Sequence, residues 1–327
     1  MPRHPLVALA LAAFANLSAA AAVVAPLPAD WYPESLAAGP DGRFYVGSWR
    51  QGAIARVDPA TGVIATIVAA GSNGMGNVQG VLVDAARGAL WACSGNLGFT
   101  TVPVSTSALK RYDLATGAPQ ASYAMPDGGY CNDLAQDAQG RLYVSDSLHP
   151  RILRWVEGAP ALSIWKEDAK LADRPVMGEF KALNGIAVDG AGLVASVFAA
   201  VPYLLRVPIE DDGSAGPVTR LEAPRAFRNV DAIRAWKPGR LVLFESNAFG
   251  AGPYGGQVTL ARIDGERLVL RTLVAGLNDP SSGLVAGARV WFIESKYGLL
   301  THRQPADGPV PTGVPFDLQS VALPEDF

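Results

Sequence analysis

Four oxygen-bearing side chains occupy one position of a repeated sequence pattern. Each opens an apolar segment and lies eight residues before a glycine that we expect to form a turn; they are Glu34, Asn132, Asn184 and Asp231. Carboxylate and amide oxygens are the ligands that hard divalent cations prefer. If the repeats are arranged radially, the four side chains converge on one axis. The shared spacing therefore predicts a cation site with a ligand charge of −2.

Two further repeats place Gly80 and Asp279 at the same position. Gly80 has no side chain, so we expect it to leave room for a substrate. Asp279 lies between Asn278 and Pro280, and we interpret it as a turn residue rather than as another acid on the axis. The alternative for the whole set is structural, because Asn and Asp at strand starts also bind backbone groups without any metal.

The glycine turns recur with a near-constant period. Gly42, Gly88, Gly140, Gly192, Gly239 and Gly287 are 46, 52, 52, 47 and 48 residues apart. Each precedes an apolar run that ends in Ser, Asp or Glu, or in the shorter fourth unit in Phe, and several units add a second hairpin, such as Ile54–Asp58 with Val63–Ile67. Four strands in about fifty residues are typical of a propeller blade. The sequence therefore predicts an all-β, six-bladed β-propeller.

We expect residues 23–327 to form this propeller as a single domain. Two β-sandwich domains are the alternative, but they would not explain six units in phase. Two terminal segments could close the ring, residues 23–27 and residues 314–323. The longest irregular connection, residues 166–181, directly precedes Asn184 and is either a lid over the site or a plain surface loop.

The first 22 residues are typical of a signal peptide. Arg3 and His4 precede an apolar run from Leu6 to Leu17, and small residues from Ser18 onward offer cleavage sites. A membrane anchor is the alternative, but the run is short for a span. We therefore expect a periplasmic or secreted protein that leaves the membrane after cleavage. Cys93 and Cys131 form either a disulfide or two separate buried thiols.

The composition and the absence of certain motifs exclude several classes of function. The 327 residues are 49% hydrophobic and carry a net charge of −3, which predicts a large core and no basic surface for nucleic acid. Only three His and two Cys residues are present, which argues against a zinc site built from them. The chain has no Gly-x-Ser-x-Gly motif, and its glycine-rich run at 71–80 lacks the residues of a phosphate-binding loop.

Several segments resemble the SMP-30/gluconolactonase/LRE-like family and, more distantly, the paraoxonases. The resemblance is carried by residues 33–48, 131–147, 183–189 and 229–233. It implies a six-bladed propeller with one divalent cation in its channel, and hydrolysis of lactones or esters. By the motif match, Glu34, Asn184 and Asp231 take the places of the metal ligands, and Asn132 matches a channel asparagine that contacts metal or substrate. The chain departs at Ser35-Leu36, where the gluconolactonase pattern continues with Gly-Pro.

The residues and the resemblance together predict a metal-dependent lactonase or esterase. We favour Ca²⁺ as the cation, with Zn²⁺, Mn²⁺ or Mg²⁺ as alternatives. The cation would polarise the carbonyl of a small-molecule lactone or ester, and Asp231 would be both ligand and general base. The alternative is a non-catalytic exported propeller, a binding or scaffold protein with a structural or vestigial metal site.

Overall fold

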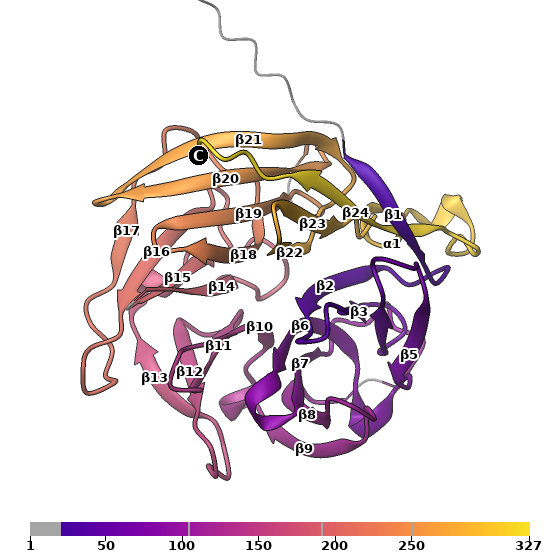
Figure 1. Ribbon diagram of the computed structural model, residues 1–327, viewed down its shortest axis with the longest axis horizontal. Coiled ribbons are helices and arrows are strands. Elements are labelled where there is room, and N and C mark those ends of the chain that lie inside the picture. Colours follow the sequence, from indigo (N-terminus) through magenta and orange to yellow (C-terminus); the bar gives the residue numbers. More distant parts are fainter. Residues whose placement is uncertain (1–20, 104, 191, 250–251) are drawn as a thin grey trace, which may run out of the picture.

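The computed structural model describes residues 21–327, except residues 104, 191 and 250–251. In this part of the chain, 24 strands form six four-stranded antiparallel sheets arranged as blades around a ring (Figure 1), which confirms the predicted six-bladed β-propeller. Residues 1–20 of the predicted signal peptide lie outside the described residues. Among the described helices, none is both long enough and apolar enough to cross a membrane.

Each blade runs from an inner strand beside the channel to an outer strand at the rim. The first blade is β2 (Pro33–Ala38), β3 (Phe44–Ser48), β4 (Ile54–Val57) and β5 (Ile64–Val68). The second is β6 (Asn77–Asp84), β7 (Ala89–Gly95), β8 (Ala108–Asp113) and β9 (Pro119–Ala124). The third is β10 (Cys131–Gln136), β11 (Leu142–Asp146), β12 (Arg151–Trp155) and β13 (Ser163–Glu167).

The other three blades follow the same plan. The fourth is β14 (Leu183–Asp189), β15 (Gly192–Val197), β16 (Tyr203–Pro208) and β17 (Thr219–Leu221). The fifth is β18 (Val230–Lys237), β19 (Arg240–Ser246), β20 (Gly256–Asp264) and β21 (Arg267–Leu277). The sixth is β22 (Ser282–Ala286), β23 (Arg289–Ile293), β24 (Phe316–Ala322) and β1 (Ala22–Leu27). The described helices are short: α1 (Gly298–Thr301), η1 (Ser72–Gly74), η2 (Ala85–Arg87), η3 (Pro126–Gly128), η4 (Ala169–Leu171) and η5 (Pro305–Asp307).

Glycine makes the tight turn between the first two strands of most blades. Gly42 and Gly239, for example, have φ angles of +78° and +69°, a left-handed conformation that glycine adopts without steric cost. The fourth blade differs from the expected pattern, because Gly190 provides the left-handed residue with φ +58°. Gly192 is instead the first residue of β15.

Both terminal segments take part in closing the ring. β24 is the third strand of the sixth blade, and β1 pairs with it antiparallel from Ala22–Ser320 to Leu27–Phe316. The first and last parts of the described chain therefore share one sheet, as Figure 1 shows. The six inner strands also contact one another in ring order, from β2 through β6, β10, β14 and β18 to β22 and back to β2.

Apolar side chains fill the spaces between neighbouring blades. Trp91 of β7 and Trp155 of β12, for example, meet with ring centroids 4.6 Å apart between the second and third blades. The serines near the ends of the second strands join blades in a different way. Ser145 Oγ donates to the carbonyl of Asn184 at 2.7 Å, and Ser196 Oγ donates to the carbonyl of Val230 at 2.7 Å. These bonds tie the third and fourth blades to the start of the next inner strand.

Candidate metal centre

A β-bulge interrupts five of the six inner strands near their first residues. The register shifts lie between Pro33 and Ser35 in β2, between Val78 and Val81 in β6, between Cys131 and Leu134 in β10, between Leu183 and Ile186 in β14, and between Val230 and Ala232 in β18. A bulge inserts one extra residue and changes the direction of its side chain. The common spacing of Glu34, Asn132, Asn184 and Asp231 in the sequence therefore corresponds to a bulge at the same place in each of their strands.

The bulges bring the four predicted ligands together. Glu34, Asn132, Asn184 and Asp231 all line one small cavity of about 30 Å³, and each comes from a different blade. This volume is close to the share of liquid volume that one water molecule occupies, and it matches a single ion in size. Their role as metal ligands stays a prediction, but their convergence on one point is a feature of the structure.

The side-chain amides of Asn184 and Asn132 are held in different ways. Its Nδ2 donates a hydrogen bond to Asp231 Oδ1 at 3.0 Å. Asn184 Oδ1 is buried and has no hydrogen-bond partner. An unpaired buried carbonyl oxygen costs free energy, so this atom needs a donor or a cation. Asn132, from the third blade, is held by a 2.8 Å bond from its Nδ2 to Ser147 Oγ.

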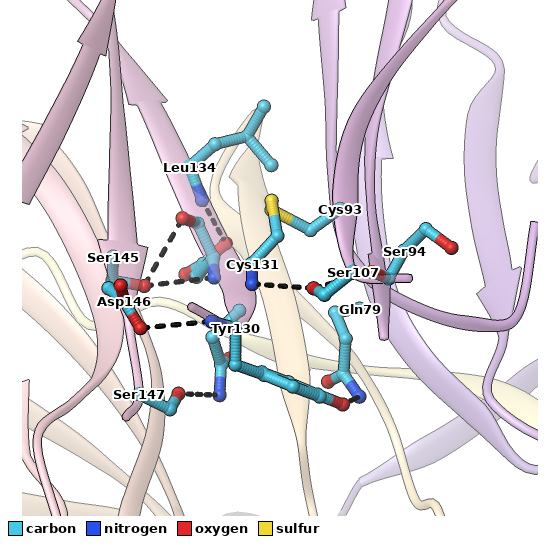
Figure 2. The surroundings of a disulfide bond; sticks show 12 residues. Gln79, Cys93, Ser94, Ser107, Tyr130, Cys131, Leu134, Ser145, Asp146 and Ser147 are labelled. Carbon is cyan, nitrogen blue, oxygen red and sulfur yellow. Dashed lines mark hydrogen bonds between the residues drawn. A yellow bond between two sulfur atoms is a disulfide. The ribbon is translucent and has the colours of Figure 1, made fainter. Parts of the chain in front are cut away.

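A residue that the sequence pattern missed, Gln79, holds Glu34 in place. Trp49 Nε1 can only donate, so the amide oxygen of Gln79 must face it at 2.9 Å and its nitrogen must face Glu34 Oε1 at 3.0 Å. Tyr130 OH donates to the same amide oxygen at 2.6 Å. Figure 2 shows Tyr130 extending toward Gln79. Gln79 also lines the cavity, so five blades contribute a polar side chain to it.

The structure corrects the expectation for Gly80. A side-chain atom built at this glycine would lie 2.6 Å from Asp133 Oδ1, so the position is closely packed and leaves no room for a substrate. The bulge in β6 presents Gln79 to the cavity instead. Asp279 has φ +57° and accepts a 3.4 Å bond from the Gly298 amide, which agrees with its interpretation as a turn residue. Asp279 does not line the cavity.

Burial and neighbouring negative charge oppose ionisation of the two acids. Burial raises the pKa of Glu34 well above its usual value, and the carboxylates of Asp231 and Asp133 raise it further. Burial also raises the pKa of Asp231 to about 7, against the lowering effect of its hydrogen bond from Asn184. Two buried carboxyl groups in one small space ionise together more readily when a cation lies between them.

An ion pair lies next to the cavity, farther along the channel. Asp133 Oδ2 accepts a 2.9 Å bond from Arg234 Nη1 and a 3.3 Å bond from the Ile186 amide. Arg234 also donates to Ser282 Oγ at 3.1 Å, so the pair links the third, fifth and sixth blades. Arg234 lowers the pKa of Glu34, but this effect is smaller than the raising effects of burial and of the neighbouring carboxylates.

Apolar and aromatic side chains enclose the rest of the cavity. They are Trp49, Leu97, Met177, Phe180, Phe198, Phe249 and Tyr297. Met177 and Phe180 belong to the connection 166–181, so this loop covers the site, as the lid hypothesis expects. Phe180 packs edge-on against Tyr130 with ring centroids 4.8 Å apart.

Arg50 and His149, which follow β3 and β11, do not line this cavity. Arg50 donates to the Phe99 carbonyl at 3.1 Å, and His149 lies 3.2 Å from Asp146.

The donor chemistry of the cavity fits a hard cation. In the described residues, no three or more His, Cys, Asp or Glu side chains are grouped so that they could hold a metal ion. A cation here would therefore depend on amide oxygens as much as on carboxylates. The unpartnered Oδ1 of Asn184 and the two carboxyl groups form such a set.

The two cysteines form a disulfide beside the cavity. Cys93 of β7 pairs with Cys131 of β10, and their Cα atoms are 5.1 Å apart. Figure 2 shows this bridge between the second and third blades, with the Cys131 amide donating to Ser107 Oγ at 2.9 Å. The next residue after Cys131 is Asn132, so the bridge fixes the backbone from which that side chain extends.

Comparisons with known proteins give a fold likeness without sequence similarity. No model of a protein family matches the sequence, and no curated protein matches it either. A gluconolactonase from Xanthomonas campestris is similar in structure, with 16% identity, a TM-score of 0.62, and coverage of 94% of this chain and 90% of that one. It is an example of the family that the sequence motifs resemble.

Two further solved structures share the architecture. The PQQ-bound aldose sugar dehydrogenase from Streptomyces coelicolor matches with 17% identity and a TM-score of 0.61, covering 92% of this chain and 98% of that one. The calcium-binding protein regucalcin from Agrobacterium tumefaciens matches with 13% identity and a TM-score of 0.57, covering 90% and 93%. At these identities the likeness shows the fold alone.

Proposed function

We propose that the protein is an exported, cation-dependent hydrolase of lactones or esters. One observation carries the proposal: the side chains of Glu34, Asn132, Asn184 and Asp231 surround an ion-sized cavity, and the Oδ1 atom of Asn184 there has no partner. The gluconolactonase and regucalcin likenesses support a small-molecule substrate and a calcium ion, by analogy of fold.

Each polar residue has a defined role in this proposal. Glu34, Asn132, Asn184 and Asp231 would hold the cation. Lewis-acid polarisation of a carbonyl is the chemistry that a divalent cation supplies when bound. The Nδ2 of Asn184 donates to the Oδ1 of Asp231 and keeps this carboxylate in place. The Oδ2 of Asp231 is therefore the atom proposed to accept the proton of the attacking water. The apolar side chains above the cavity would exclude other water.

Export is the second part of the proposal. The predicted signal peptide supports it, and the Cys93–Cys131 disulfide suits an oxidising compartment. A periplasmic or secreted location would also expose the protein to free Ca²⁺ more consistently than the cytosol does.

The test combines metal content with hydrolysis. The mature protein should contain about one divalent ion per chain and cleave members of a lactone and ester panel. Asp231→Asn and Glu34→Gln should lower kcat/KM by about 100-fold or more. Asp189→Asn is the matched control, because Asp189 is a buried acid at the other end of β14, where it accepts a 2.7 Å bond from the Gly239 amide. No metal uptake by the wild-type protein would refute the proposed site.

A non-catalytic propeller with a structural ion is the second candidate. The small volume of the cavity, about 30 Å³, favours it, because a substrate carbonyl does not fit beside an ion without movement of the enclosing side chains. A protein that binds one ion tightly but cleaves no lactone or ester would be this binding or scaffold module.

A further inference from the structure

An ion pair separates the ion-sized cavity from a second space in the channel. Along β10, Asn132 lines the ion-sized cavity, and Leu134 lines a lower cavity of about 270 Å³ that later residues of all six inner strands form. Asp133 lies between these two residues. Along β18, Asp231 lines the ion-sized cavity and Arg234 lines the lower one. None of the described residues lines both cavities, so the pair of Asp133 and Arg234 lies between them.

Arg234 is held in this place by bonds to three inner strands, β10, β18 and β22, which surround the channel (Figure 1). Its Nη1 donates to Asp133 Oδ2 at 2.9 Å and to the Ile233 carbonyl at 2.7 Å, and its Nη2 donates to Ser282 Oγ at 3.1 Å. The side chain of Arg234 is 19% exposed and that of Asp133 is 5% exposed. Little water screens the pair, so the guanidinium is a fixed positive charge beside the ion-sized cavity.

Both charges of the pair act on the acids of the ion-sized cavity. Burial is the largest cause of the raised pKa of Glu34 and Asp231. The Asp133 carboxylate raises the pKa of both further, and the Arg234 guanidinium lowers that of Glu34. Asp279 also raises the pKa of Asp231, and this contribution is independent of the ion pair. A cation in the cavity would experience the same charges, so Asp133 would attract it and Arg234 would repel it.

We propose that Arg234 determines the cation specificity of the site, because its fixed charge repels a bound ion in proportion to the charge of that ion and so favours Ca²⁺ over trivalent ions. This inference rests on the cation site of the proposed function. Asp133 compensates charge rather than binding the ion, since Oδ2 is bonded to Arg234 and to the Ile186 amide, and Oδ1 to the Leu134 amide. A charge that changes the affinity for a divalent ion about tenfold should change that for a trivalent ion about thirtyfold.

The test measures the affinity of the mature protein for Ca²⁺ and Tb³⁺. Trp49 lines the cavity, so excitation of tryptophan should sensitise the emission of Tb³⁺ bound there, and displacement by Ca²⁺ gives the second affinity. Arg234→Met should strengthen binding of Ca²⁺ about tenfold and of Tb³⁺ about thirtyfold. Asp133→Asn should weaken both by the same factors. The Asp133→Asn/Arg234→Met variant has the wild-type charge and should return both affinities to within about threefold of the wild type.

A purely structural ion pair would give a different result, because every one of these substitutions would then weaken cation binding. Arg234→Lys keeps the charge without the forked hydrogen bonds and should retain the Ca²⁺ affinity within about threefold. Arg141→Met is the matched control. Arg141 and Asp137 form an ion pair of similar exposure, 21% and 4%, with an N–O distance of 2.5 Å, and neither lines the ion-sized cavity. Its loss should leave the ratio of Tb³⁺ to Ca²⁺ affinity unchanged.

The outcomes separate the role of Arg234 from the cation site itself. If Arg234→Met does not fold, Asp133→Asn and the double variant give the same comparison, because they differ only at residue 234, and the double variant should bind both ions more tightly. A wild-type protein that binds neither ion would refute the cation site. A wild-type protein that binds Ca²⁺, with weaker binding after loss of the Arg234 charge or with an unchanged ratio of Tb³⁺ to Ca²⁺ affinity, would overturn the role of Arg234 and leave the cation site in place.

Discussion

Glu34 and Asp231 are two acids in one small cavity. None of the described residues that line this cavity has a cationic side chain. Burial raises the pKa of both, to about 7 for Asp231. For an acid whose pKa is raised by folding, the neutral form stabilises the native state. That contribution is complete below the unfolded pKa of about 4 and is lost as pH rises through the folded pKa.

The first prediction concerns pH and Ca²⁺. Without the ion, the thermal unfolding midpoint should decrease as the pH is raised from 5 to 8, because ionisation of Asp231 and Glu34 then opposes folding. Bound Ca²⁺ removes this penalty, so the stabilisation by Ca²⁺ should be larger at pH 8 than at pH 5. Thermal unfolding with Ca²⁺ or with a chelator at both pH values measures the difference. The Glu34→Gln/Asp231→Asn double variant should lose it, and an equal Ca²⁺ effect at both pH values in the wild type would contradict the prediction.

The second prediction concerns Gln79. Gln79→Leu removes the donor to Glu34 and leaves Trp49 Nε1 and the Tyr130 hydroxyl without their acceptor. We expect a loss of about 1–3 kcal/mol in the free energy of unfolding and about tenfold weaker cation binding. Chemical denaturation and titration with Ca²⁺ give the two values. Gln136→Leu is the matched control, since Gln136 lies in an inner strand and bonds to Asp84 away from the cavity; equal loss of cation affinity in both variants would argue against a positioning role for Gln79.

At the scale of residues, the sequence predicted the convergence of Glu34, Asn132, Asn184 and Asp231 because spacing alone carries the phase of a repeat. It did not predict Gln79, because in the second blade the same spacing falls on Gly80. The bulge in β6 spans both positions, and only three-dimensional packing decides which of the two faces the cavity. Asp133 was missed as a separate group for the same reason, because its bulge sends it toward Arg234.

At the scale of the elements, the inner strands show why the orientation of these side chains could not be predicted from the sequence. A bulge is a mismatch between two strands, so it cannot be identified from one strand without the register of its partner. The serines of the second strands were visible in the sequence as a recurrent ending. Their role became clear only from Ser145 and Ser196, which bond to the carbonyls at the start of the next blade. The connection 166–181 likewise could be identified as long, but its contact with the cavity depends on the whole fold.

The third prediction concerns the disulfide between β7 and β10. It closes a segment of 38 residues, for which the chain-entropy model gives about 4 kcal/mol of stabilisation. The Cys93→Ser/Cys131→Ser variant should therefore unfold at lower denaturant concentration and bind Ca²⁺ more weakly through Asn132. Denaturation of the wild type with and without a reductant provides the control. A reductant that destabilises the double variant as much as the wild type would show that the bridge is not the cause.

On the scale of the whole molecule, the regular spacing of glycines was sufficient to predict six blades. The closure of the ring could not be predicted, because both terminal segments have the composition of strands. The structure uses both, with β24 inside and β1 at the outer edge of the sixth blade. The likeness to a gluconolactonase and to a sugar dehydrogenase over more than nine-tenths of this chain shows that one scaffold serves different chemistry.

The fourth prediction concerns β1. A chain that begins at Asp30 loses β1 with the buried side chains of Ala25 and Leu27, and leaves the edge of β24 unpaired. We expect it to be less stable by about 3 kcal/mol or more, and to aggregate more readily than a chain that begins at Val23. Chemical denaturation and light scattering of the two proteins test this. Equal stability of both chains would show that β1 does not hold the ring closed.

The pairing of β1 with β24 also sets an order of events during synthesis. β1 is among the first described segments to leave the ribosome, and β24 is among the last, so the sixth blade has to wait until nearly the whole chain has been made. Until then the first blade has no neighbour on one side. Pairing between such distant segments is slow, so the chain should remain incompletely folded for some time after the first blades have formed. Refolding from denaturant should accordingly be slower for the full chain than the formation of its individual hairpins.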